Sequence, residues 1–383
     1  MAETIFADRV LIGGRIQKDV LIEIDDGRIG EIRINTSGNS SAFRVPSSCL
    51  VIPGFVDIHC HGFGPDSFGA GFASARRATL AHRARGTTSL VAGLVSSDTE
   101  DTSRAIASLA TLTGEGIIDG VFLEGPFISV ARRGAHREGF VRPVDLGLLS
   151  HWLEQSKGTI RMVTLAPELS GALDAIRFLV REGVVAAIGH TDATYEETRS
   201  AIDAGASVAT HLGNGMPSLF ARQPGPLLAL MESPKVSCEL IADGRHVHPC
   251  LVRYFVNHAI SGVPIFVSDC LGVEGEGKHI ALVSDRLVEM DDGAVVFKDN
   301  GKLAGTALPL SGILKSSVTK AGIDLITAVS AATIGPARTI GLEDRGKIET
   351  GYRADLVLLN GTSLDVARVM RCGNWVVEKH EYE

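Results

Sequence analysis

The feature that most constrains the fold is an alternation of short apolar segments with segments of helical periodicity. Segments such as 74–86 and 173–183 space their apolar residues as helices packed on a sheet do. Strands that are buried on both faces and joined by crossover helices indicate a parallel sheet, and eight such units close a barrel. The sequence therefore predicts an α/β fold of the (β/α)8 TIM-like barrel type. The eight expected strands are 50–61, 87–95, 117–125, 160–167, 184–190, 207–212, 236–243 and 264–270.

Both ends of the chain have a different pattern. Residues 1–50 contain short β-type segments broken by glycine and Asp-Gly turn signals, and residues 345–383 are again rich in β-type segments. We expect these two ends to form one small β-sandwich domain beside a catalytic barrel of residues 51–344. Within the barrel segment, residues 286–305 are typical of a hairpin, and two helices are expected near 307–335.

Composition argues against several classes of partner. The net charge is −8 and the 37 basic residues are scattered, so the chain has no basic patch for nucleic acid. The apolar runs are well short of the roughly 20 residues that a membrane helix needs, and we find no secretory signal. The six cysteines are dispersed without a CxxC pair, which indicates neither a disulfide scaffold nor a zinc knuckle. We expect a soluble cytoplasmic protein.

Residues able to bind a metal lie at the ends of the expected strands, where barrel enzymes build their active sites. His59 and His61 end the first strand and share one face. Each residue alone has an ordinary alternative: a structural histidine, a turn residue or a helix N-cap. Together, imidazoles and a carboxylate are the usual ligands of zinc or iron, so the sequence predicts a divalent metal site with an aspartate that could handle protons. The remaining members of this set are Glu124, His190, His211 and Asp269.

Motifs in a characteristic order extend over nearly the whole chain. They are PGFVDIHCHG (53–62), LEGPFIS (123–129), RRGAH (132–136), IGHTDAT (188–194), THLGNGMPS (210–218), IADGRHVHP (241–249), VSD (267–269), LAGTAL (303–308) and GYRADLVLL (351–359). In this order they resemble the N-acetylglucosamine-6-phosphate deacetylases of the amidohydrolase superfamily. The resemblance implies a metal-dependent barrel that hydrolyses the acetamide of N-acetylglucosamine-6-phosphate to glucosamine-6-phosphate and acetate. Such an enzyme would serve the recycling of amino sugars from cell walls and chitin.

The resemblance also implies a ligand set. Glu124, His190 and His211 would hold the main catalytic metal, and the chain keeps the His59–His61 pair that allows a second one. One or two divalent ions, zinc or iron, are therefore expected per subunit. The expected strand 160–167 has no lysine of the kind that bridges two metals in many amidohydrolases, which makes Glu124 the natural substitute. This absence counts against dihydroorotase-like or hydantoinase-like chemistry.

The same resemblance assigns roles in the reaction. Asp269 would take the proton from the attacking water and deliver it to the departing amine. Its alternative roles are a metal ligand or an N-cap. His136 would contact the substrate near the carbonyl and help to bind the developing oxyanion.

The phosphate end of the substrate needs donors. Asn214 and Gly215 lie in a glycine-rich loop whose backbone N–H groups could bind an anion. By resemblance, His246 would contact the sugar phosphate, and Arg222 would reach the phosphate of a neighbouring subunit's substrate. That role of Arg222 implies a homodimer; taken alone, the residue could equally be a surface charge.

Three alternatives stay open. The loop reads HLGNGMPS where the family more often has HLFNAM, a change that enlarges the pocket or loosens the backbone. Another N-acetylated sugar phosphate or an N-acyl amino acid is therefore an alternative substrate. Arg132 and Arg133 could be further phosphate contacts or solvated surface charges. A non-catalytic protein on the same scaffold would usually have lost ligands that this chain keeps.

Overall fold

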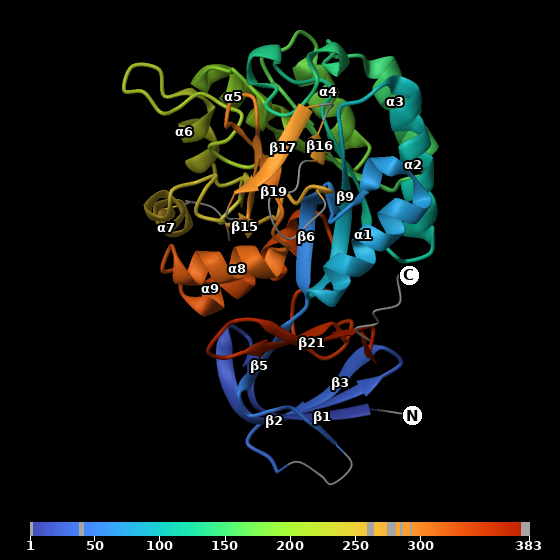
Figure 1. Ribbon diagram of the computed structural model, residues 1–383, viewed down its shortest axis with the longest axis vertical. Helices are drawn as coiled ribbons and strands as arrows, with labels where there is room; N and C mark the ends of the chain where they lie inside the picture. Colours follow the sequence, from blue (N-terminus) through green and yellow to red (C-terminus); the bar gives the residue numbers. More distant parts are fainter. Residues whose placement is uncertain are drawn as a thin grey trace.

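The computed structural model describes residues 3–37, 42–258, 264–273, 281–283, 286–291 and 293–376. At its centre, eight parallel strands are hydrogen-bonded in chain order, which confirms the predicted barrel (Figure 1). The barrel is nearly closed, and the two ends of the sheet meet where the Asp269 N–H donates to the carbonyl oxygen of His59 at 2.9 Å. The strands are β6 (Phe55–Cys60), β9 (Thr87–Val95), β10 (Gly120–Glu124), β11 (Ile160–Leu165), β12 (Val185–Ile188), β13 (Val208–Ala209), β14 (Ser237–Leu240) and β15 (Ile265–Phe266).

Helices cover the outside of the barrel (Figure 1). The helical segments expected at 74–86 and 173–183 are α1 and α4. Several helices begin at a capping residue: Thr194 and Glu197 form a capping box before α5, which satisfies backbone N–H groups that the first turn leaves free. No helix in the described part of the chain is long and apolar enough to cross a membrane. The α-helices are α1 (Phe72–Ala84), α2 (Thr99–Gly114), α3 (Leu146–Ser156), α4 (Ala172–Arg181), α5 (Tyr195–Ala204), α6 (Gly225–Met231), α7 (Pro249–His258), α8 (Leu310–Thr319), α9 (Leu325–Ala331) and α10 (Ile334–Thr339).

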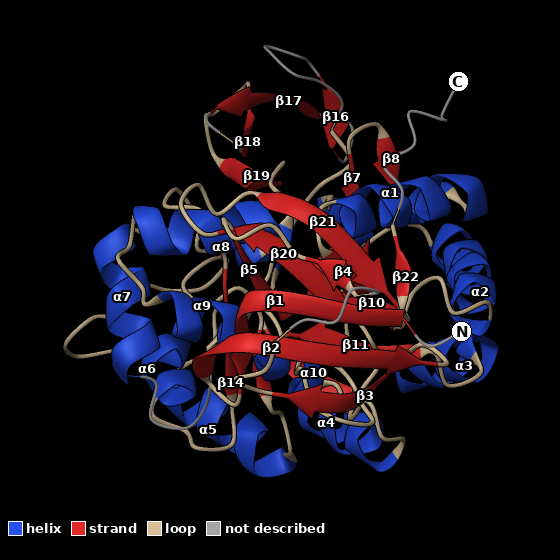
Figure 2. Cartoon of the chain, turned by 90° about the horizontal axis from the view of Figure 1, so that it is seen from below, coloured by secondary structure: helices blue, strands red, loops and turns tan. Residues whose placement is uncertain are grey.

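Both ends of the chain form a second, sheet-rich domain, as predicted. Its strand order is β22, β21, β20, β5, β1, β2 and β3, with β4 paired to β1. Figure 2, which views the molecule from below, shows these strands lying across the end of the barrel that faces the viewer. The strands are β1 (Glu3–Ile12), β2 (Arg15–Asp25), β3 (Arg28–Arg33), β4 (Phe43–Arg44), β5 (Cys49–Pro53), β20 (Leu356–Asn360), β21 (Val366–Arg371) and β22 (Asn374–Trp375).

The expected first strand, 50–61, is in fact two strands. Its first half is β5 in the terminal sheet, and its second half is β6 in the barrel. The chain crosses between the domains at Gly54, whose N–H donates to the carbonyl oxygen of Asp355 at 2.9 Å. A Cβ there would lie 2.1 Å from Thr88 Oγ1, so the crossing has no room for a side chain. The domain boundaries at 50/51 and 344/345 stay predictions.

A small antiparallel sheet lies at the upper end of the barrel, opposite the terminal domain (Figure 1). It contains the expected hairpin of residues 286–305, apart from position 292, which lies outside the described residues. An isolated bridge between Cys270 and Thr306 joins this sheet to the segment after β15. The carboxyl ends of the barrel strands are thereby partly covered. The strands are β16 (Ala281–Val283), β17 (Arg286–Asp291), β18 (Ala294–Phe297) and β19 (Leu303–Thr306).

Candidate active site

The six residues predicted at the strand ends converge at one rim of the barrel. They form two groups, and within each group one ligand atom per residue lies within 4.8 Å of the others. All six are buried. The groups are His59, His61 and Asp269, and Glu124, His190 and His211.

The Glu124 group has the spacing of a metal site. Glu124 Oε1 lies 3.0 Å from His190 Nε2 and 3.1 Å from His211 Nε2, and the two nitrogens are 3.0 Å apart. Ligands about 2.05 Å from a tetrahedral zinc would lie about 3.3 Å from one another. His190 Nδ1 lies 2.8 Å from the carbonyl oxygen of Arg132, which can only accept. His190 therefore carries hydrogen on Nδ1 and presents the lone pair of Nε2 to the group, as a metal ligand does.

The second group has a similar spacing. The Nε2 atoms of His59 and His61 are 3.2 Å apart, and each lies 3.5 Å from Asp269 Oδ1. On its other side, His59 Nδ1 lies 2.8 Å from the buried carboxylate oxygen Oε2 of Glu239. Because a carboxylate accepts, the hydrogen lies on His59 Nδ1, and Nε2 is free to bind a cation.

Glu124 lies between the two groups. Its Oε1 contacts His190 and His211, and its Oε2 lies 3.2 Å from His61 Nε2. Burial alone would raise the pKa of Glu124, but when no metal is bound the protonated forms of His59 and His190 and the hydrogen bonds from His136 and His190 outweigh it and hold that pKa well below its usual range. The carboxylate therefore stays ionised at neutral pH, which suits a cation-binding group.

Backbone conformation turns several of these side chains inward. His190, His211 and Asp269 have φ angles of +48°, +30° and +46°, in the left-handed region. Such conformations cost non-glycine residues about 1–3 kcal/mol each and cluster at functional sites. All three lie two or three residues beyond the end of a barrel strand, where the chain must bend sharply.

His136 faces the same centre with the opposite tautomer. Its Nδ1 accepts the backbone N–H of Ser96 at 3.2 Å, so its hydrogen lies on Nε2. That Nε2 lies 3.4 Å from Glu124 Oε2. Burial lowers the pKa of His136 to about 4, which keeps the ring neutral at physiological pH. His136 is therefore a neutral hydrogen-bond donor to whatever occupies the site.

These residues open onto a cavity of about 150 Å³. The predicted substrate residues Asn214, Gly215 and His246 line it, whereas Arg222 does not. His246 Nδ1 donates to Asp243 Oδ2 at 2.7 Å, and this partner lowers the pKa of Asp243 although burial would raise it. The remaining lining residues include His61, Val95, Glu124, Gly134, Ala135, His136, His190, His211, Asp269, Leu271, Val283, Leu303 and Ala304.

The loop after His211 is held tightly to the ligand residues. The Asn214 side-chain amide donates to the carbonyl oxygen of His211 at 3.2 Å. Gly215 has a φ of +59°, and a Cβ there would lie 3.0 Å from His190 Nδ1. The glycine at 215 therefore lets the backbone approach the metal-binding histidines closely.

The three arginines of interest lie outside the cavity. Arg222 is exposed in the loop before α6, beside Leu219 and Phe220, which are 56% and 62% exposed. Arg132 Nε donates to Asp192 Oδ1 at 2.8 Å, and Arg133 lies 3.3 Å from Glu138. Arg132 and Arg133 thus form partly exposed ion pairs, and which of their two expected roles applies stays a prediction.

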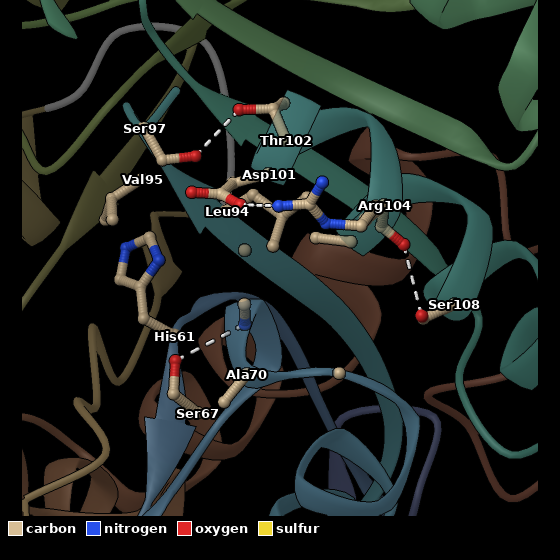
Figure 3. Close-up of a pocket in the computed structure, with 14 residues that line it drawn as sticks. His61, Ser67, Ala70, Leu94, Val95, Ser97, Asp101, Thr102, Arg104 and Ser108 are labelled. Carbon is tan, nitrogen blue, oxygen red and sulfur yellow. Dashed lines mark hydrogen bonds and ion pairs between the residues drawn. The ribbon is translucent and has the colours of Figure 1, made fainter. Parts of the chain in front are cut away.

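A second hollow, of about 600 Å³, lies on the outer side of His61 (Figure 3). In Figure 3 the His61 ring and Val95 lie on one side of it, and Asp101 and Arg104 of α2 on the other. His61 and Val95 also line the first cavity, so they separate the two spaces.

Sequence reasoning missed Glu239 and Ser96. Glu239 lies in the strand segment 236–243, which was read only as a buried strand, although a glutamate among apolar residues was a usable signal. Ser96 carries no signal in the sequence, because its role depends on contact with His136, 40 residues away.

Comparison with known proteins agrees with this geometry. The sequence model of the Amidohydrolase family matches residues 50–376. An N-acetylglucosamine-6-phosphate deacetylase from Vibrio furnissii is 32% identical over 363 residues, 92% of this chain and 90% of that protein. An N-acetylgalactosamine-6-phosphate deacetylase from a Shewanella species is 32% identical over 361 residues, which are 92% of this chain and 90% of that protein. Among solved structures, a mutant N-acetyl-D-glucosamine-6-phosphate deacetylase from Mycobacterium smegmatis is 37% identical to this chain, with a TM-score of 0.93. The match covers 98% of this chain and 99% of that one, and that structure is a complex with N-acetyl-D-glucosamine-6-phosphate.

Proposed function

The chain belongs to the amidohydrolase family, and from this premise we propose that it deacetylates N-acetylglucosamine-6-phosphate. The products are glucosamine-6-phosphate and acetate, and the reaction belongs to amino-sugar recycling. The observation that carries the proposal is the meeting of two candidate metal groups and a neutral donor histidine at one cavity. The end-to-end likeness to deacetylases of this sugar phosphate supports the same substrate.

The family is metal-dependent, and the donor set suits a divalent cation. Glu124, His190 and His211 would hold one ion, and His59 and His61 a second one next to Glu124. When bound, such an ion lowers the pKa of water and polarises an amide carbonyl. Imidazole and carboxylate suit zinc and iron alike, so we propose one or two ions of either metal per subunit.

Asp269 would move the proton. Its Oδ1 lies 3.5 Å from Nε2 of both His59 and His61, and the residue lines the cavity. The carboxylate takes a proton from water as the new C–O bond forms, then delivers it to nitrogen as the C–N bond breaks. An amide nitrogen leaves poorly unless it is protonated, so one group at this position serves both steps.

His136 would stabilise the charge that develops on the carbonyl oxygen. Its Nε2–H faces the centre, because Ser96 holds its Nδ1 as an acceptor. A donor that is fixed before the reaction needs no reorganisation when the oxyanion forms.

The sugar phosphate would lie at the outer end of the cavity. Asn214, Gly215 and His246 line that space and supply polar groups to it. We propose that Arg222 reaches the phosphate bound by a neighbouring subunit, so that the working unit is a homodimer. Exposed Leu219 and Phe220 beside Arg222 support this, because large apolar side chains in a surface loop are typical of an interface.

We further propose a cytoplasmic location. All six cysteines are unpaired in the structure, which suits a reducing compartment. An enzyme that uses an intracellular sugar phosphate would also meet its substrate there.

An acetate assay tests the function. Purified protein loaded separately with several divalent metals should release acetate from N-acetylglucosamine-6-phosphate, and removal of the metal by a chelator should stop the release. N-acetylglucosamine without the 6-phosphate should be a poor substrate, because the phosphate contacts are lost. Absence of acetate with every metal tested would end the proposal.

N-acetylgalactosamine-6-phosphate is a second candidate substrate. The Shewanella relative named for that sugar is as similar to this chain, at 32%, as the Vibrio relative named for the glucosamine form. The two sugars differ only at the C4 hydroxyl, so kcat/KM for both should be measured under one set of conditions. A clear preference for the galactosamine form would replace the first candidate.

A further inference from the structure

We propose that Glu239 is a positioning residue that couples the two ligand groups of the metal centre. The inference rests on the proposed function only in that it assumes a metal centre at this site. Glu239 lies on β14, is fully buried, and does not line the substrate cavity. Any effect on the reaction must therefore pass through the residues that it contacts.

One oxygen of Glu239 contacts both groups. Oε2 accepts from His59 Nδ1 at 2.8 Å and from the backbone N–H of His211 at 3.1 Å. His59 belongs to one candidate metal group and His211 to the other. A single carboxylate oxygen thus contacts two candidate ligands, one on the first barrel strand, β6, and one just after the sixth, β13.

The contact with His59 decides which nitrogen can bind metal. Because the carboxylate accepts, it holds the hydrogen of His59 on Nδ1 and leaves the Nε2 lone pair facing His61 and Asp269. Without that acceptor, the hydrogen could move to Nε2, and the ring would no longer be a ligand. His61 Nδ1 has no hydrogen-bond partner among the described residues, so His59 is the member of this pair whose tautomer is fixed.

The contact with His211 holds a strained backbone. His211 has a φ of +30°, and its own Nδ1 lacks a partner within the described part of the chain. On the side away from Glu124 and His190, main-chain contacts hold the residue, and the N–H bond to Glu239 is one of them. The carbonyl oxygen of Glu239 also accepts the Leu212 N–H at 2.8 Å, and this backbone bond would survive a side-chain change.

Packing alone does not account for a glutamate at this position. Its second oxygen, Oε1, is buried and has no hydrogen-bond partner among the residues described. A buried polar atom without a partner destabilises the folded state, and more so when it is charged. An apolar side chain at this strand position would destabilise the folded protein less. The glutamate must therefore contribute through the two candidate ligands that Oε2 contacts, His59 and His211.

The test compares Glu239→Gln with Asp119→Asn. Asp119 is also a buried carboxylate, paired with Arg345 at 3.0 Å, and lies before β10 at the far end of the barrel. Both changes replace a buried carboxylate by a neutral amide, whose oxygen accepts hydrogen bonds much more weakly than a charged carboxylate does, but only Glu239 contacts the ligands. Zinc affinity is measured by competition with a coloured chelator, zinc content by elemental analysis, and ligand geometry by the absorption spectrum of the cobalt-loaded protein.

We expect Glu239→Gln to bind zinc about 10–100-fold more weakly and to alter the cobalt spectrum, with the greater loss for the ion near His59. Asp119→Asn should keep wild-type affinity and spectrum even if its thermal midpoint falls. Wild-type affinity and spectrum in Glu239→Gln would overturn the proposal. Equal loss of affinity in both variants would also overturn it, because it would indicate a general loss of stability.

If Glu239→Gln fails to fold, Glu239→Asp replaces it. The shorter side chain keeps the buried charge but withdraws the carboxylate by one methylene, so the same loss of zinc affinity is expected. Unchanged affinity in that variant would overturn the proposal. These readouts need no substrate, so a failure of the wild-type protein to release acetate would refute the proposed function and leave this inference to be judged separately.

Discussion

For three of the histidines, a hydrogen-bond partner on the outer side of the ring decides what the imidazole can do in the site. Glu239 and the Arg132 carbonyl hold the hydrogens of His59 and His190 on Nδ1, so their Nε2 atoms are available to a metal. Ser96 does the reverse for His136, whose Nε2–H is available to a substrate oxygen. One residue type thus supplies both ligands and a donor, and the neighbours assign the roles.

Replacing Asp269 by Asn tests proton transfer. The amide has nearly the same size but cannot accept the proton from water, so kcat should fall about 100-fold or more. Metal held by Glu124, His190 and His211 should be retained, because that group does not include Asp269. Steady-state kinetics with elemental analysis of the same sample checks both points.

The exposed Asp299, which pairs with Arg286, offers a matched control. Asp299→Asn makes the same chemical change outside the cavity lining and should keep the wild-type kcat. A kcat near wild type in Asp269→Asn would remove that residue from its proposed role.

His82 should make stability depend on pH. Its ring is fully buried, its Nε2 lies 3.0 Å from the carbonyl oxygen of Gly62, and burial lowers its pKa from 6.5 to about 4. The unfolded chain takes up a proton at higher pH than the folded protein does. Stability from this group is therefore full above pH 6.5 and is lost as pH falls toward 4, by about 2 kcal/mol at pH 5.

The measurement is the thermal midpoint at pH 7.5 and pH 5 for the wild type and His82→Gln. Glutamine keeps a donor for Gly62 but does not titrate, so its midpoint should fall less between the two pH values. His151→Gln, at an exposed position on α3, should keep the wild-type pH dependence. Identical pH dependence in all three proteins would show that His82 does not contribute.

At the scale of elements, the pairing of β9 with β6 sets the space behind His61. Gly93 of β9 has no side chain, and a Cβ there would lie 2.8 Å from His61 Nδ1 and 2.7 Å from the Cys60 carbonyl oxygen. Gly93→Ala should therefore displace the His61 ring and weaken binding of the second metal ion. Zinc titration should show fewer than two tightly bound zinc ions per chain.

Gly69→Ala is the matched control for that change. Gly69 also lines the hollow outside His61, but a Cβ there would lie 3.9 Å from its nearest neighbour, Leu94 Cδ2. The variant should bind zinc as the wild type does. Normal zinc binding by Gly93→Ala would mean that the strand can shift to admit a methyl group.

Element order was predictable because each barrel strand is a short apolar run between clear turn residues. Polar residues at the strand ends could be grouped for the same reason, since parallel strands end at one rim. The division of the first strand at Gly54 was not predictable, because it depends on contacts with Thr88 and Asp355. Glu239 was missed on similar grounds: its partners His59 and His211 lie 180 and 28 residues away.

At the scale of the molecule, the barrel carries the candidate site and the terminal domain supports the barrel. The terminal sheet lies at the end of the barrel where the strands begin (Figure 1). The residues of the candidate site lie at or just after the carboxyl ends of the strands. Buried Arg353 links them: its guanidinium donates to the Thr88 carbonyl oxygen at 3.1 Å and to Ser89 Oγ at 2.9 Å. Both acceptors lie on β9, the strand that also carries Gly93. The terminal domain therefore holds a strand that lies against His61 of the candidate metal site.

The proposed homodimer makes a prediction that only a whole assembly can test. Arg222 lies outside its own cavity, so Arg222→Ala should raise KM by losing a charge-assisted phosphate contact from the partner subunit. The turnover number should change little, because no residue near the reacting atoms is altered. A change confined to kcat would contradict a phosphate-binding role.

Mixed dimers separate an arginine that acts across the interface from one that acts within its own subunit. In a dimer of one Arg222→Ala chain and one Asp269→Asn chain, the first chain keeps Asp269 and receives Arg222 from the second. One complete site is then restored, so a randomly assorted equal mixture should recover about a quarter of wild-type activity at low substrate concentration. If Arg222 acts on its own subunit's substrate, every mixed dimer contains two defective sites. Refolding the variants together and assaying the mixture against the separate proteins therefore decides where the arginine acts.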